Sequence, residues 1–204
     1  FAVILSSLNE LGYTVEWRVI NAADYGMPQR RKRIFILAYK KGSNIQKQFS
    51  SLKDPKLWVS KAGAIQQSFP ADITTAFTEF TLDKDPVVVS ETFNLEKPKV
   101  SPFANAGVCA DYKVHTARVA PKYTGKHTTL TDILTPEEEV PEEFFIAKED
   151  FKRWEYLKGS KAEKRKAASG FEFFYKEGAV AFPEPLDKAS RTIITSEGGP
   201  TPSR

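Results

Sequence analysis

Cysteine is nearly absent from this sequence of 204 residues, which contains only Cys109, and histidine is almost as rare, with His115 and His127. A single cysteine excludes a disulfide within the chain and a cysteine-based zinc cluster, and the two histidines lack the spacing of a metal site. We therefore expect no metal centre. The lack of disulfides also predicts an intracellular protein.

Long hydrophobic runs are missing as well. No stretch approaches the roughly 18 consecutive apolar residues that a membrane-spanning helix needs, and no signal peptide is visible. The sequence begins Phe1-Ala2-Val3-Ile4-Leu5, without an initiator methionine and inside an apolar pattern. We predict no membrane partner and expect the chain to be a piece of a longer protein.

Positive charge is only slightly in excess: the sequence has 30 lysines and arginines and 26 acidic residues, for a net charge of +4. Such a balance permits nucleic-acid binding without indicating it. Hydrophobic residues make up 41% and charged residues 27%, as in ordinary globular proteins. The length suffices for one or two domains with a core.

Hydrophobic periodicity predicts the elements of the first forty residues. Apolar residues at helical spacing predict a helix over residues 1–11, with Gly12 as its stop signal. Alternating, β-branched residues predict strands over 14–20 and 31–39, with a loop over 21–29 between them. A helix and two strands in this order are typical of the end of an α/β layer.

The later sequence gives weaker signals. We predict short elements at residues 45–52 (helix), 87–89 (strand), 129–134 (one helical turn), 148–156 (helix) and 160–168 (helix). The window 152–166 is rich in lysine and arginine, with aromatic residues interleaved. Two interpretations stay open: a surface that follows a DNA backbone, or a charged solvent face whose aromatics anchor a helix.

The most informative stretch is Gln29-Arg30-Arg31-Lys32-Arg33, which leads directly into an apolar strand. The side chains of basic residues at the start of a strand point in defined directions, unlike those of basic residues in a flexible loop. With a side-chain period of two, Arg31 and Arg33 share one face of the strand and Lys32 lies on the other. Paired guanidinium groups suit phosphate oxygens and base-edge acceptors.

This block also carries a family resemblance. Residues 25–33 read Tyr-Gly-x-Pro-Gln-x-Arg-x-Arg and precede an apolar strand, and the upstream segments 11–15 and 21–26 match as well. The pattern resembles the Gln-x-Arg-x-Arg block of DNA cytosine-5 methyltransferases. It implies double-stranded DNA as partner and S-adenosyl-L-methionine as cofactor of the parent enzyme.

The resemblance also implies a mechanism. In that family the target cytosine is flipped out of the duplex, a cysteine thiolate attacks C6, and a glutamate assists at N3. By position, Arg33 would contact the O2 side of the cytosine, Arg31 would support the catalytic loop or backbone, and Gln29 opens the block. A permanently charged guanidinium group would stabilise electron density that develops on the carbonyl of the cytosine ring.

Other blocks of that family are missing from the sequence. The nucleophile would stand in a Pro-Cys pair, but Cys109 follows Val108, and neither a Phe-x-Gly-x-Gly loop nor a Glu-Asn-Val triplet is present. We interpret Cys109 as a buried small apolar residue. The piece alone is predicted neither to bind the cofactor nor to methylate DNA.

The end of the chain resembles the family's target-recognition region, where a threonine and a branched residue precede a Gly-Gly loop. The ordinary alternatives are a strand threonine and a tight turn. The predicted DNA-binding residues are Arg30, Lys32, Arg191, Thr192, Ile193, Gly198 and Gly199. Three loop cations, either phosphate contacts or solvated, are Arg118, Lys122 and Lys126.

These observations predict an α+β chain. Residues 1–42 would form the C-terminal helix–strand–strand edge of a doubly wound α/β catalytic domain. Residues 43–204 would form an irregular, β-rich recognition domain with short helices. The parent would be a bacterial restriction–modification methyltransferase, cytoplasmic and nucleoid-associated, with its restriction endonuclease as a genetic partner only. The alternatives are a non-catalytic module that grips phosphates, and an interaction protein whose basic cluster is a targeting signal.

Overall fold

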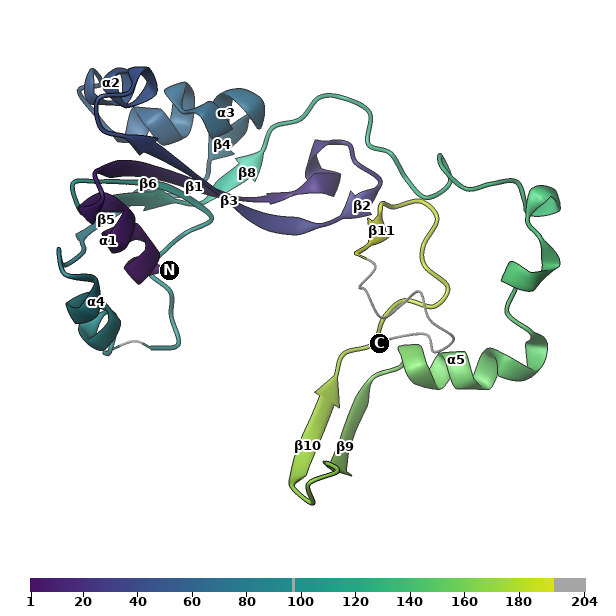
Figure 1. Cartoon of the computed structure of the whole chain (residues 1–204). Coiled ribbons are helices and arrows are strands. Elements are labelled where there is room, and N and C mark those ends of the chain that lie inside the picture. The colour runs from purple at the N-terminus through teal and green to yellow at the C-terminus, as the bar shows by residue number, and fades with distance from the viewer. Residues whose placement is uncertain (97, 193–204) are drawn as a thin grey trace. The chain divides into compact units, whose positions relative to one another are not determined.

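The computed structural model describes residues 1–96 and 98–192, which divide into two compact units (Figure 1). Unit 1 contains residues 1–26 and 31–126, and unit 2 contains residues 27–30 and the chain from 127 onward. The basic block is therefore shared between the two units.

Unit 1 is built on a five-stranded sheet with the strand order β3-β1-β6-β7-β5. Its strands are β1 (Tyr13–Asn21), β3 (Lys32–Lys40), β5 (Thr78–Thr81), β6 (Ala106–Ala110) and β7 (Lys113–Ala117). Neighbouring strands all pair antiparallel. A separate pair joins β4 (Ala71–Ile73) to β8 (Val119–Pro121), also antiparallel.

Helices cover both faces of the five-stranded sheet (Figure 1). On one side lie α1 (Ala2–Glu10) and α4 (Pro86–Thr92). On the other side lie α2 (Asn44–Ser50), the π-helical turn η2 (Trp58–Ala62) and α3 (Ala64–Ser68). Each face of the sheet therefore has its own core.

The alternation of strand side chains separates these two cores. Val15, Trp17 and Cys109 pack on the side of α1 and α4. Tyr39 and Val108 pack on the other side with the residues of α2 and η2. Strands β1 and β6 contribute to both layers, and residues 13–26, 31–40 and 106–117 all belong to unit 1. The division of the chain at 42/43 into a catalytic and a recognition part stays a prediction.

Strand β3 forms one edge of the sheet and carries apolar side chains on both faces. Ile34 and Ile36 are 48% and 36% exposed, and Phe35 and Leu37, on the opposite face, are 44% and 37% exposed. Strands with apolar residues on both faces are typical of sheets covered by further layers. The apolar side chains of edge strand β3 are thus more exposed to solvent than is usual for a strand of this composition.

Unit 2 has little regular structure apart from one helix and two strand pairs. Helix α5 (Phe151–Lys158) precedes an antiparallel ribbon of β9 (Lys161–Lys166) and β10 (Glu172–Glu177). A short parallel pair joins β2 (Gln29–Arg30) to β11 (Ser190–Arg191). The single-turn 3-10 helices are η1 in unit 1 (Ala22–Tyr25) and, in unit 2, η3 (Glu137–Glu139), η4 (Glu142–Phe144) and η5 (Lys148–Asp150).

The α+β class is confirmed, as are the first helix, the two strands after it and the helix near residue 45. Two predictions were wrong. Val87–Val89 lie in α4 rather than a strand, because the Asp85 carboxylate accepts from the Val87 amide and caps a helix that has proline at its first position. Within residues 160–168, Lys161–Lys166 form β9 rather than a helix, because pairing with β10 outweighs local propensity.

Within the two described stretches, none of the helices is both long and apolar enough to cross a membrane. The same residues contain no group of three or more His, Cys, Asp or Glu side chains that could hold a metal ion.

Candidate nucleic-acid interface

The turn before the basic block depends on Gly26. It ends η1 with φ of +88°, a conformation that side chains rarely adopt. A Cβ at this position would also lie 2.6 Å from Tyr123 Oη and 2.7 Å from the Lys126 carbonyl oxygen. Only glycine therefore fits, and the chain has a defined path up to the block.

Tyr25, next to that glycine, is anchored to a distant loop of unit 1. Its hydroxyl donates to the Pro70 carbonyl at 3.1 Å, and its ring packs edge-to-face on Phe69 at 5.2 Å. Arg18 Nη1 donates to the Phe69 carbonyl at 2.8 Å. Burial raises the pKa of Tyr25 and lowers that of Arg18. Both groups act here as fixed hydrogen-bond donors, and no motif or periodicity predicts this link.

Regular strand pairing begins at Lys32, opposite Asn21, and places Arg33 opposite Ile20. Arg33 therefore lies on the sheet face of α2 and α3, whereas Lys32 lies on the other face. Arg33 is exposed, and its Nη1 donates to the Lys32 carbonyl at 2.7 Å. Arg31 precedes the strand, and its carbonyl accepts from the Ala22 amide at 3.0 Å. The shared strand face of Arg31 and Arg33 stays a prediction.

Gln29 and Arg30 lie beside the far end of the described chain. In the parallel pair of β2 and β11, Gln29 is opposite Ser190 and Arg30 is opposite Arg191. The Thr192 hydroxyl donates to the Arg30 carbonyl at 2.8 Å. Three predicted DNA-binding residues from two separate regions, Arg30, Arg191 and Thr192, are thus brought together, and Gln29 of the predicted catalytic block lies beside them. Three further residues with that assignment lie outside the described residues: Ile193, Gly198 and Gly199.

Glu184 is a member of this cluster that the sequence analysis missed. One carboxylate oxygen forms an ion pair with Arg30 Nη2, and the other lies 3.4 Å from Arg191 Nε. The Arg191 amide also donates to Glu184 at 2.9 Å. A carboxylate between two guanidinium groups offsets part of their positive charge, so Arg30 and Arg191 attract phosphate less strongly than free arginines. The Arg30 side chain still is 47% exposed.

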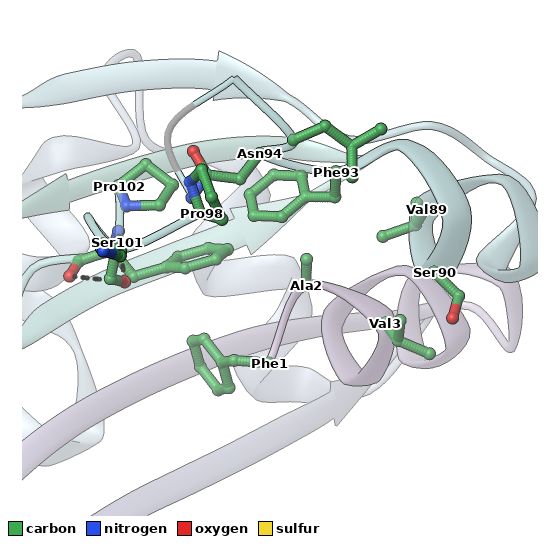
Figure 2. A pocket seen from close by; sticks show the side chains of 13 residues that line it. Phe1, Ala2, Val3, Val89, Ser90, Phe93, Asn94, Pro98, Ser101 and Pro102 are labelled. Atoms are coloured by element: carbon green, nitrogen blue, oxygen red, sulfur yellow. Dashed lines mark hydrogen bonds between the residues drawn. The ribbon is translucent and has the colours of Figure 1, made fainter.

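Two cavities of unit 1 are lined by neither Arg31 nor Arg33. A cavity of about 200 Å³ is lined by Lys32, Asn21 and Tyr25 among others, but not by Arg31 or Arg33. A larger one, of about 510 Å³, lies between the start of α1 and the chain after α4, where Phe1 and Phe93 point into it (Figure 2). It is lined by none of the predicted site residues.

Cys109 is fully buried in β6 among apolar core residues, and its Sγ lies 3.7 Å from Asn9 Oδ1. Burial raises the pKa of the thiol to about 12. At pH 8 only about one thiol in ten thousand would be ionised, and the thiolate is the reactive form. The interpretation of Cys109 as a buried small residue agrees with this environment.

We expect the Cys109 thiol to resist modification in the folded chain. A thiol-specific reagent at pH 8 should label it at least about 100-fold more slowly than it labels the same residue in 6 M guanidinium, because both ionisation and access are suppressed. Mass spectrometry of the peptide that contains Cys109 measures both rates. Rapid labelling of the native protein would contradict the buried, protonated thiol.

Comparisons of the sequence place this chain among known proteins. A family model described as C-5 cytosine-specific DNA methylase matches residues 1–198. The type II methyltransferase M.Sau3AI of Staphylococcus aureus is 36% identical over 200 residues, which cover 97% of this chain and 46% of the relative. The chain thus spans about half the length of that protein.

Shorter matches involve other type II methyltransferases. M.NlaIV of Neisseria lactamica is 47% identical over 55 residues, covering 27% of this chain and 13% of the relative. M.HhaI of Haemophilus parahaemolyticus is 43% identical over 44 residues, covering 22% and 14%. No solved structure matches the chain.

Proposed function

This chain belongs to the C-5 cytosine-specific DNA methylase family, and we propose that it supplies two parts of such an enzyme. One is the recognition of a DNA sequence, and the other is the arginine-bearing strand of the catalytic site. The enzyme as a whole would transfer a methyl group from S-adenosyl-L-methionine to a cytosine flipped out of double-stranded DNA.

The pairing of β2 with β11 is the observation that supports this proposal most. It attaches the start of the basic block, Gln29 and Arg30, to Arg191 and Thr192, about 160 residues later in the chain. A recognition segment that is hydrogen-bonded to the catalytic block would fix the register of the bound sequence relative to the reacting cytosine. Such coupling is what a sequence-specific methyltransferase needs, since it must act on one base of its site.

Strand β3 supports a role within a larger catalytic domain. Its open edge and its apolar side chains on both faces, Ile34 to Leu37, would be covered by further strands and helices of the enzyme. We propose that residues 1–42 are the C-terminal edge of a doubly wound catalytic domain and that recognition lies within residues 43–204. The length of M.Sau3AI, of which this chain covers 46%, leaves room for such a domain.

Arg33 would be the residue of this chain that acts directly on the reacting cytosine. Its guanidinium group is exposed at the start of β3 and is permanently charged. Placed against the O2 side of the flipped cytosine, it would stabilise negative charge that develops on the ring when a nucleophile adds to C6. Arg31 would support the neighbouring backbone, and Gln29 would hold the start of the block.

The residues present do not fit the cofactor or the nucleophile. The sequence has no Phe-x-Gly-x-Gly loop, and Cys109 is buried with a raised pKa. We assign both functions to the remainder of the enzyme, and this piece alone should be inactive. The enzyme would belong to a bacterial restriction–modification system and would act on nucleoid DNA in the cytoplasm, with its endonuclease as a genetic partner only.

A competition experiment separates this proposal from a module that merely grips phosphates. The full-length protein should bind duplexes with one short sequence about 10³-fold or more tightly than unrelated duplexes at physiological salt. A phosphate grip predicts nearly equal affinities that fall together as salt rises. Selection from a randomised duplex pool followed by sequencing measures the preference. Equal recovery of all sequences would overturn the recognition role.

A further inference from the structure

The ribbon of β9 and β10 has two chemically different faces, because directly opposed residues of an antiparallel pair share a face. The first face, here called the inner face, carries Lys161, Glu163, Arg165, Phe173, Tyr175 and Glu177. The outer face carries Ala162, Lys164, Lys166, Glu172, Phe174 and Lys176.

The side chains of the inner face make hydrogen bonds and ion pairs within unit 2. The buried Lys161 ammonium donates to the Leu157 carbonyl of α5 at 2.9 Å and forms an ion pair with Glu177 at 2.9 Å. The Arg165 guanidinium lies 3.7 Å from the centre of the Tyr175 ring. The cations on this face therefore hold the ribbon together and tie it to the helix.

The outer face is exposed at all six of its positions. Among the described residues Lys164 and Lys166 form no ion pair, and Lys176 lies over the Phe174 ring at 5.5 Å. Glu172, opposite Lys166 in the register, is the only acid on this face. The outer face thus presents three exposed lysines, of which only Lys176 contacts an aromatic ring of this face.

We propose that this outer face binds the phosphate backbone of the DNA, an inference that rests on the proposed function. Phosphates complement the excess of lysines over the single acid, and lysine binds phosphate as a flexible point charge. A two-stranded ribbon also has the width that the major groove of B-form DNA admits. Lys164 and Lys166 lie about 7 Å apart along β9, which would let them follow successive positions of one strand.

The test removes the three charges and leaves the inner face intact. In the full-length enzyme, the triple variant Lys164→Gln, Lys166→Gln and Lys176→Gln should bind the duplex selected above with a weaker salt dependence. The slope of log K against log salt should become less negative by about 2.7, since each lost phosphate contact contributes about 0.9. At 0.1 M salt the affinity should fall on the order of 100-fold.

A matched variant removes three exposed lysines of unit 1, Lys41, Lys47 and Lys53, with the same change in net charge. Its slope should equal that of the unchanged enzyme. Single glutamine variants of the ribbon guard against misfolding of the triple variant, and each should reduce the slope by about 0.9. Base preference should be the same in all of them, because phosphate contacts carry no sequence information.

Two failures lead to different conclusions. If the unchanged enzyme binds its selected duplex and the ribbon variants keep its salt slope, the ribbon assignment is wrong while the proposed function stands. If the unchanged enzyme shows no preference for any duplex, the proposed function itself fails. Equal losses in the ribbon and control variants would also overturn the assignment, because they would reflect net charge alone.

Discussion

Replacement of Arg33 by alanine in the full-length enzyme is expected to lower kcat for methyl transfer by about 100- to 1000-fold. The register of β3 places Arg33 at the second pair of the strand, where its side chain is exposed and donates a hydrogen bond to the carbonyl of Lys32. Removing one charged donor from a preorganised site costs about 3–4 kcal/mol of transition-state stabilisation. Transfer of labelled methyl groups from S-adenosyl-L-methionine to the selected duplex, under single-turnover conditions, measures the loss.

Lys32 provides the matched control, because it is the adjacent exposed cation of the same strand and lies on the other face of the sheet. Lys32→Ala should alter DNA affinity and its salt dependence while kcat stays within about threefold. Arg33→Lys keeps the charge but loses the planar fork, so it should recover only part of the rate. Near-normal turnover of Arg33→Ala, with DNA bound at saturation, would remove this residue from the catalytic site.

The sequence alone identified the basic block, because its spacing combines a turn, a cation run and an apolar strand in a recognisable order. It could not reveal that Glu184 forms ion pairs with both Arg30 and Arg191. A single acid between two prolines gives no periodic signal, and its partners are distant in sequence. Long-range pairing, as between β2 and β11, depends on tertiary contacts that local propensity does not encode.

The same limit explains the errors in secondary structure. Residues 160–168 were predicted as helix from their composition, yet pairing with β10 makes most of them a strand. Residues 43–126 pack with the first strands because β6 pairs with β1. Where the signal was local, as for Gly12 after the first helix, sequence and structure agree.

Within this packing lies the buried carboxylate of Glu16, a residue that is 2% exposed. It accepts hydrogen bonds from Tyr39 Oη at 2.6 Å, from Trp58 Nε1 at 2.7 Å and from the Ile65 amide at 3.0 Å. The carboxylate on β1 therefore connects β3, η2 and α3. Periodicity predicted a strand here but gave no reason to expect a buried acid within it.

Glu16→Ala should destabilise unit 1 by on the order of 3–5 kcal/mol, because it leaves the donors on Tyr39, Trp58 and Ile65 buried without their acceptor. The denaturant midpoint, followed by tryptophan fluorescence, should fall, and the Ile65 amide should exchange its hydrogen faster. Glu16→Gln should lose less, since it keeps one acceptor oxygen. Glu10→Ala, at the exposed end of α1, should change stability by no more than about 0.5 kcal/mol. Equal midpoints for Glu16→Ala and Glu10→Ala would mean that apolar packing alone holds residues 58–69 on the sheet.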